Sequence, residues 1–294
     1  MTSTLLLSVR PSGRYRIAVL NNGEAEHVDE LPAPTREGNI YKGRVHAVEP
    51  SIQSVFVNIG AARNGFLHIS DVEPGCYTAR KATPLPGREK PPMEDILKRG
   101  DDVVVQIIKE ATHPTKGPTV TTYLSLAGPG LVLMPGLDRV GVSRRIADAD
   151  RQRLHETIRQ LQPPPGLGFI VREAGLHHSA EQFRAEMAYL HHAWLGLLAR
   201  CIAPAPVEVY RESHPLAWLM NRLCTGRFDQ AWIDDPALYK EARTFARPAL
   251  PHLADRIRLY EGAEPLLEHH GIREEDLGRT APPLVDKLNE DGRG

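Results

Sequence analysis

The chain opens with three short runs in which apolar and polar residues alternate. These runs are TLLLSVR, RYRIAVL and EAEHVDEL, and they are separated by Pro11-Ser12-Gly13 and Asn21-Asn22-Gly23. Alternation with a period of two is typical of β-strands, and both triplets favour tight turns. Residues 1–31 are therefore predicted to form a three-stranded antiparallel meander.

A second series of short strand patterns begins at Asn39. It comprises NIYKGRVHAV, SVFVNIG, NGFLHI, DDVVVQIIKEA and TVTTYLSL. Five short strands favour a small closed barrel. The interruption at residues 72–100 is rich in proline and glycine, so we expect a surface loop that adds nothing to a core and ends in a short helix, MEDILKRG.

From Gly128 the pattern is that of a small α/β block. LVLMPG predicts a buried strand, SRRIADADRQRLHETIRQLQ an amphipathic helix, and PPPGLGFIVREAG a turn followed by a strand. Residues 179–201 predict a long helix that opens on a Ser/Glu signal.

Beyond Ala203 strands and helices alternate. The strand patterns are VEVYRE, QAWIDD and RIRLY, and the helical ones are PLAWLMNRLCT, PALYKEARTFA and, more weakly, AEPLLEHHG. Such alternation implies a parallel sheet. Three leading antiparallel strands that continue, after a long excursion, as β-α-β-α-β resemble the ribonuclease-H-like fold.

The predicted fold class is therefore multidomain α+β. The barrel and the α/β block would be inserted into the ribonuclease-H-like subdomain. We expect that subdomain at residues 1–35 and 204–277, the barrel at 36–122, the α/β block at 123–203, and a polar tail at 278–294.

Composition narrows the class of protein. The 294-residue chain is 41% hydrophobic, which is too apolar for a disordered protein. It shows neither a signal peptide nor an apolar run long enough to cross a bilayer, so we expect a cytoplasmic protein with no membrane partner. The net charge is −1, so any nucleic-acid site must be a local patch. The three cysteines lack the paired spacing of a zinc or redox site.

The stretch FVNIGAARNGFLHISD places Phe56 and Phe66 on neighbouring predicted strands. An aromatic ring can stack on any base, which contributes about 1–3 kcal/mol per base, so single-stranded RNA is the predicted ligand. The nearby candidate phosphate contacts are Lys42, Arg44, Arg63 and Lys116. The alternative is that Phe56 is a core residue, because strand residues alternate and one of two aromatics often faces inward.

The run NIYKGRVHAVEPSIQSVFVNIGAARNGFLHISDV, followed by TTYLSLAGPGLVLMP, VSRRI and GFIVREAG, closely resembles the N-terminal half of the ribonuclease E and ribonuclease G family. The likeness extends from residue 1 to about residue 270. It implies that the barrel is an S-one-type OB-fold domain in which Phe56, Phe66 and Lys116 touch RNA. It also implies a role in RNA processing, ribosomal RNA included, with single-stranded RNA and a full-length family member as partners and no DNA.

The same resemblance implies a pocket for a 5′-monophosphate in the block after the barrel. Its matching positions and their cationic neighbours are Gly128, Val132, Arg172, Arg144 and Arg145. The Arg172 guanidinium can grip phosphate oxygens at two points. Glu173 departs from the family's threonine, and an ionised carboxylate repels phosphate. The alternative is that Arg172 and Glu173 are ordinary solvated residues at a strand end.

We predict no catalytic residue, metal ligand or cofactor within this chain. Members of the family use magnesium held by two aspartates in a segment resembling Asp-Ile-Asn-Ser, and that segment is missing here, as is the family's cysteine-rich zinc link. Neighbouring carboxylates on a strand point to opposite faces, which argues against Asp101-Asp102 and Asp234-Asp235 as metal sites. The histidine pairs lack the i, i+4 spacing of a helical metal site; they are His177-His178, His191-His192 and His269-His270.

Three functions therefore stay open. The first is a relative that binds single-stranded RNA and does not cleave it by itself. The second is an endoribonuclease, either as part of a longer protein or through an unrecognised metal site. The third is a scaffold whose barrel contacts protein.

Overall fold

The computed structural model describes residues 3–10, 12–31, 35–76, 90–113, 115–137, 139–212, 215–216, 219, 222, 228–249 and 254–280. The chain forms two compact units, one made of residues 1–34 and 214–294 and the other of residues 35–213. Most of the predicted helix PLAWLMNRLCT and residues 281–294 of the expected tail lie outside the described residues. Within those ranges no helix combines the length and the apolar character needed to span a membrane.

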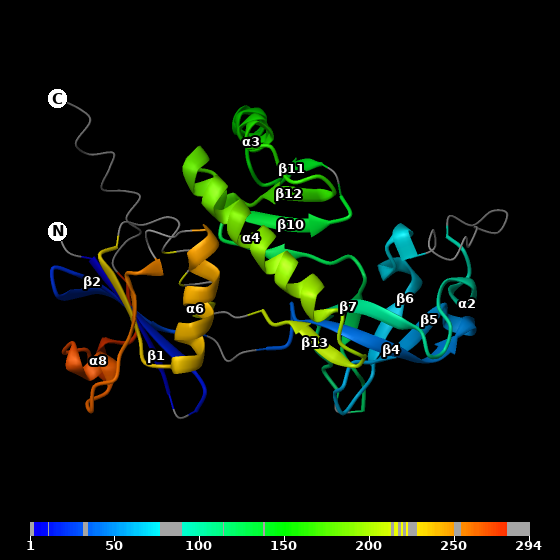
Figure 1. Cartoon of the computed structure of the whole chain (residues 1–294), viewed down its shortest axis with the longest axis horizontal. Helices are drawn as coiled ribbons and strands as arrows, with labels where there is room; N and C mark the ends of the chain where they lie inside the picture. Colours follow the sequence, from blue (N-terminus) through cyan, green and yellow to red (C-terminus); the bar gives the residue numbers. More distant parts are fainter. Residues whose placement is uncertain are drawn as a thin grey trace. The chain divides into compact units, whose positions relative to one another are not determined.

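The first unit contains a sheet whose described strands follow the order β15-β14-β1-β2-β3-β16. Figure 1 labels β1 and β2 of this sheet. These strands are β1 (Ser3–Val9), β2 (Tyr15–Asn21), β3 (Glu24–Glu30), β14 (Gln230–Ile233), β15 (Ile257–Leu259) and β16 (Arg279–Thr280). The predicted antiparallel meander is confirmed in β1, β2 and β3, and β14 and β15 run parallel to β1. The helices of this unit include α6 (Pro236–Ala249) and α8 (Leu266–His269), whose Leu266 packs with Leu6 in the core.

Two expectations about strands were wrong. Arg279 and Thr280, assigned to a polar tail, form β16 and pair with β3. The strand β13 (Val207–Tyr210), expected in the parallel sheet, pairs antiparallel with β4 (Ile40–Glu49) in the other unit. Side-chain hydrogen bonds support that pairing, because the Tyr41 hydroxyl donates to Glu208 at 2.9 Å. A strand pattern reveals the strand but not which sheet edge accepts it.

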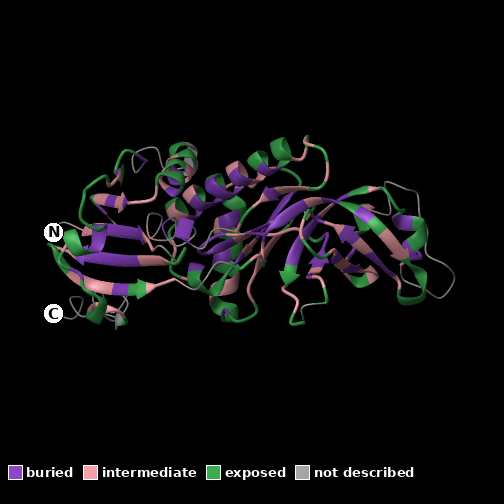
Figure 2. Ribbon diagram, turned by 90° about the horizontal axis from the view of Figure 1, so that it is seen from below, coloured by how far each residue is buried: buried purple, intermediate pink, exposed green. Residues whose placement is uncertain are grey.

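The second unit contains a closed barrel made of five of its described strands. They are β4, β5 (Ser54–Asn58), β6 (Gly65–His68), β7 (Asp102–Lys109) and β8 (Thr119–Thr121). Pairing of β4 with β7 closes the barrel, and β6 runs parallel to β8. This arrangement supports the predicted OB-fold. Buried and less buried positions alternate along β6 and along Tyr41–His46 of β4, and Figure 2 colours the buried residues of the chain purple.

The segment between β6 and β7 contributes to the barrel core, contrary to expectation. Val72, Met93 and Ile96 are fully buried in that core, and the last two belong to α2 (Met93–Ile96). These apolar residues stand singly among prolines and charges, so no periodicity reveals them. Residues 77–89 of this segment lie outside the described residues.

The α/β block has a sheet with the order β11-β12-β10-β9 among the described strands. Its elements are β9 (Leu126–Ala127), β10 (Leu131–Pro135), β11 (Val140–Val142), α3 (Asp148–Gln160), β12 (Leu167–Val171) and α4 (Ala180–Arg200). The predicted serine start of α4 is confirmed, because Ser179 accepts a hydrogen bond from the Gln182 amide. In the reciprocal bond the Ser179 amide donates to the side-chain oxygen of Gln182, so the polar partner is not Glu181. Helix α4 packs against β10.

Candidate nucleic-acid interface

Phe56 and Phe66 lie directly opposite each other on β5 and β6. Their neighbours Val55, Val57 and Leu67 are fully buried, so alternation directs both phenylalanines to the outer face of the barrel. Both rings are half-buried, with centroids 5.8 Å apart and planes tilted by 57°. The alternative that Phe56 is a core residue is therefore wrong.

The two rings line a cavity of about 610 Å³ on the barrel. Its other lining residues are Arg63, Asn64, Thr115, Lys116, Gly117 and Thr119. The side chains of Arg63 and Lys116 are exposed at this cavity. The loop that carries Arg63 and the loop that carries Lys116 meet here, because the Phe66 amide in β6 donates to the Pro118 carbonyl just before β8 at 2.8 Å. The structure thus brings together four residues that were predicted from the sequence, namely Phe56, Phe66, Arg63 and Lys116.

Gly117 is required by the close approach of these two loops. A Cβ at this position would lie 1.7 Å from the backbone oxygen of Asn64. Neither Gly117 nor Asn64 was predicted from the sequence as part of the cavity. The only signal for them was their place in turn-forming stretches, which does not reveal that the turns meet.

Lys42 and Arg44 are engaged within the protein. The Lys42 ammonium donates to the backbone carbonyls of Cys201 and Ala203, at 3.0 Å each, and lies 3.5 Å from Asp102. Arg44 donates to Asp102 at 2.9 Å, and this bond lowers the pKa of the Asp102 carboxyl below its usual value. Neither cation lines the aromatic cavity. We therefore do not include Lys42 or Arg44 in the candidate interface.

Gly128, Val132 and Arg172 meet on the sheet of the α/β block. Val132 is half-buried between the fully buried Leu131 and Leu133, so it lies on the face opposite the core. The Arg172 side chain donates to the Gly128 carbonyl at 2.7 Å. Burial raises the pKa of the Glu212 carboxyl, while the charge of Arg172 acts in the opposite direction.

The charged residues at the edge of this block are exposed. Arg145 lies 3.7 Å from Glu173, and their side chains are 82% and 61% exposed. Arg144 is exposed in the same turn. An ion pair this exposed is weak, so it does little to hold the Arg145 guanidinium in one position.

A buried carboxylate supports this block and was missed from the sequence. Glu186 on α4 is 0% exposed, and its Oε1 accepts from the amides of Gly130 and Leu131 at 2.8 and 2.7 Å. The signal was a charged residue in the apolar stripe that includes Phe183 and Leu190. Such a residue is rarely buried without partners.

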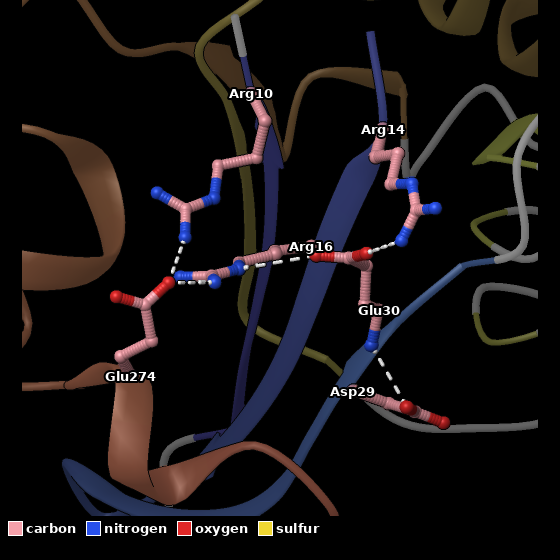
Figure 3. Close-up of polar contacts among 6 residues, drawn as sticks. All are labelled: Arg10, Arg14, Arg16, Asp29, Glu30 and Glu274. Carbon is pink, nitrogen blue, oxygen red and sulfur yellow. Dashed lines mark hydrogen bonds and ion pairs between the residues drawn. The ribbon is translucent and has the colours of Figure 1, made fainter. Parts of the chain in front are cut away.

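A cavity of about 1040 Å³ lies in the described part of the first unit. Figure 3 shows Arg10 and Arg16 converging on one carboxylate oxygen of Glu274 at its wall. Arg14 donates to Glu30 at 2.7 Å, and Arg16 lies 3.5 Å from the same carboxylate. The guanidinium groups are thus paired with carboxylates, and we assign no ligand to this cavity.

The carboxylates of the two neighbouring aspartate pairs are engaged in hydrogen bonds or ion pairs within the protein. Asp234 accepts from the Ser8 hydroxyl and the Val9 amide, and Asp235 accepts from the Leu238 amide. In the other unit, Asp101 accepts from the Lys98 amide, and Asp102 is paired with Arg44. Across the described ranges, no group of three or more histidine, cysteine or acidic side chains is placed to hold a metal ion.

The fold defines a mixed α/β protein built around a closed five-stranded barrel, as far as the described residues extend. A family model described as the Ribonuclease E/G family matches residues 125–281, more than half of the chain. The chain belongs to the ribonuclease E/G family.

Individual relatives agree with this assignment. The chain is similar to Ribonuclease E of Haemophilus influenzae, with 34% identity over 276 residues, and to Ribonuclease E of Escherichia coli, with 33% identity over 273 residues. Each alignment covers 91% of this chain. Ribonuclease G of Salmonella typhimurium is 30% identical over 281 residues, or 94% of this chain. The matched parts are 29%, 25% and 56% of the lengths of these three relatives.

Proposed function

We propose that this chain binds single-stranded RNA on the outer face of its barrel, with bases stacked on Phe56 and Phe66. The observation that carries the proposal is the cavity that these two outward rings share with Arg63 and Lys116. Stacking supplies affinity without base preference, and the two cations neutralise phosphates. The site is local, as a net charge of −1 requires.

The proposal includes an assignment of domains. Residues 36–122 would be the S-one-type OB-fold domain, and residues 123–203 the block that contacts the RNA end. Residues 1–35 with 204–277 would form the ribonuclease-H-like subdomain, with the difference that β13 pairs with the barrel strand β4. A full-length ribonuclease of the family is a further proposed partner.

The test replaces both rings by leucine, which keeps apolar bulk but removes the π-face. The Phe56→Leu and Phe66→Leu double variant should bind a labelled single-stranded RNA at least about tenfold more weakly, equal to about 1.4 kcal/mol. Ile52→Ala is the control, because Ile52 is an exposed apolar residue that does not line the cavity. Affinity is measured by fluorescence anisotropy, with DNA of the same sequence as a weaker competitor. Unchanged affinity of the double variant would favour a protein-binding scaffold.

A second proposed contact is a pocket for the 5′-monophosphate of the RNA, formed by Gly128, Val132 and Arg172 with Arg144 nearby. The hydrogen bond from Arg172 to the Gly128 carbonyl supports it, because it brings the guanidinium to the glycine. Glu173 opposes a phosphate and would weaken the pocket. The test is the ratio of affinities for hydroxyl-ended and monophosphate-ended RNA of one sequence.

RNA cleavage is the other candidate function, because the relatives are named ribonucleases. The carboxylate pairs Asp101-Asp102 and Asp234-Asp235 are held by backbone amides, a hydroxyl and cations, which argues against either pair as a magnesium site. We therefore propose that the described residues bind RNA without cutting it. Purified protein with magnesium should leave labelled RNA intact, and cutting that EDTA abolishes would establish the nuclease instead.

A further inference from the structure

Glu186 connects helix α4 to the turn that precedes β10. Its carboxylate is fully buried, and one oxygen accepts both the Gly130 and the Leu131 amide. A buried carboxylate is costly unless it is well hydrogen-bonded, and bonds to a charged acceptor are stronger than neutral ones. The contact therefore fixes the turn at residues 128–131 to a helix more than fifty positions away along the chain.

The two glycines of this turn fit around Glu186 and its neighbour His178. A Cβ at Gly128 would lie 2.3 Å from the Glu186 Oε1, and the next nearest atoms also belong to Glu186. A Cβ at Gly130 would lie 2.6 Å from the His178 ring. His178 in turn lies 3.6 Å from the other Glu186 oxygen. Absence of a side chain at Gly128 thus makes room for the buried carboxylate, and absence of one at Gly130 makes room for the His178 ring.

The opposite side of the same turn holds Arg172. The Gly130 carbonyl accepts the Arg172 amide at 2.7 Å, and the Gly128 carbonyl accepts the Arg172 guanidinium at 2.7 Å. Glu186 does not touch the guanidinium by any of these bonds. It holds the Gly130–Leu131 peptide group, whose carbonyl accepts the Arg172 amide, and so fixes the turn two residues after the Gly128 carbonyl that accepts the guanidinium.

We infer that Glu186 is a positioning residue for recognition of the RNA 5′-phosphate, acting through the turn 128–131 on Arg172. This inference rests on the proposed 5′-monophosphate pocket and adds a residue that no part of that proposal contained. Without the carboxylate, the turn loses its attachment to α4 and the guanidinium loses its fixed direction. The barrel interface, which lies on other residues, keeps its affinity.

The test compares Glu186→Leu with Glu186→Gln. The amide oxygen of glutamine can still accept both backbone amides, whereas leucine has similar volume and accepts neither. We expect Glu186→Leu to lower the affinity ratio of monophosphate-ended to hydroxyl-ended RNA at least fivefold, or to one. Its affinity for hydroxyl-ended RNA should stay within twofold, and Glu186→Gln should keep the ratio within twofold. Glu181→Gln, an exposed carboxylate on the same helix, is the matched control.

Retention of the full ratio by a folded Glu186→Leu variant overturns the inference. Amide hydrogen exchange at Gly130 and Leu131 provides the second measurement and separates this inference from the pocket itself. If the unaltered protein shows no preference for monophosphate-ended RNA, the proposed pocket fails. In that case, slow exchange of these two amides in the unaltered protein, together with at least tenfold faster exchange in Glu186→Leu, still supports attachment of the turn by Glu186. Fast exchange of these amides in the unaltered protein overturns the inference. This measurement needs no variant, so it also tests the inference if Glu186→Leu does not fold.

Discussion

Replacing Gly117 by alanine should loosen the aromatic cavity and weaken RNA binding. The added Cβ would lie 1.7 Å from the Asn64 backbone oxygen, whereas contacts under 3.0 Å are essentially never seen for real Cβ atoms. The loop with Lys116 must therefore move away from the loop with Arg63. Overpacking of this kind costs about 1–3 kcal/mol. For a unit of this size each kcal/mol corresponds to about 2–4 °C in Tm, so we expect Tm to fall by roughly 2–12 °C.

The same displacement should reduce RNA affinity about three- to tenfold, because Lys116 and the Phe66 ring no longer share one cavity. Thermal unfolding by circular dichroism and RNA binding by fluorescence anisotropy measure the two effects. Gly196→Ala is the matched control: nothing lies within 4 Å of its new Cβ, and alanine favours the helix by about 0.5–1 kcal/mol. An unchanged Tm together with unchanged affinity in Gly117→Ala would refute the reasoning.

Three further predictions concern charge. Lys116→Ala should weaken RNA binding and reduce by about 0.7 the slope with which log affinity falls against log salt concentration. Lys42→Met should instead lower Tm and leave RNA affinity within twofold. Equal losses of affinity in the two variants would contradict this. The pKa of Glu274 is lowered, chiefly by its hydrogen bond from Arg16. The ionised Glu274 carboxylate therefore stabilises the fold fully above its unfolded pKa of about 4.3, and this stabilisation is lost as pH falls through the folded pKa. Glu274→Gln should make Tm less sensitive to acid below about pH 5. An unchanged dependence of Tm on pH would argue against a stabilising contact between Glu274 and Arg16. Glu173→Thr should raise the preference for monophosphate-ended over hydroxyl-ended RNA, and a preference already high in the unaltered protein would contradict the repulsion argument.

Local chemistry made parts of the fold predictable. The turn Asn21-Asn22-Gly23 is a clear case, because Asn22 and Gly23 both adopt the positive φ that a tight hairpin requires. The barrel strands were predictable because their apolar positions alternate, and the same alternation directs Phe56 and Phe66 outward. These features depend on neighbours along the chain.

Features that depend on distant partners were not predictable. The pattern of Val207–Tyr210 reveals a strand, but its pairing with β4 depends on the partner edge and on Tyr41, which lies opposite Glu208 and donates to it. Lys42 has the charge of a phosphate contact, and only the end of α4 shows where its ammonium is bound. Glu186 was visible as a misplaced charge, but its acceptors' positions were not. In each case the missing information was a contact between segments far apart in the sequence.

Lys42 on β4 connects the barrel to the segment that follows helix α4 of the α/β block. The carbonyls at the end of a helix carry partial negative charge, and the Lys42 ammonium donates to Cys201 and Ala203 just after α4. The chain then enters β13, in which Val207 pairs with Lys42 on β4. The first barrel strand, β4, thus pairs with β13, the strand that follows the α/β block along the chain. Both proposed RNA contacts belong to this one compact unit, so Lys42 affects RNA only through the stability of that unit, which is why its loss should change Tm and not affinity.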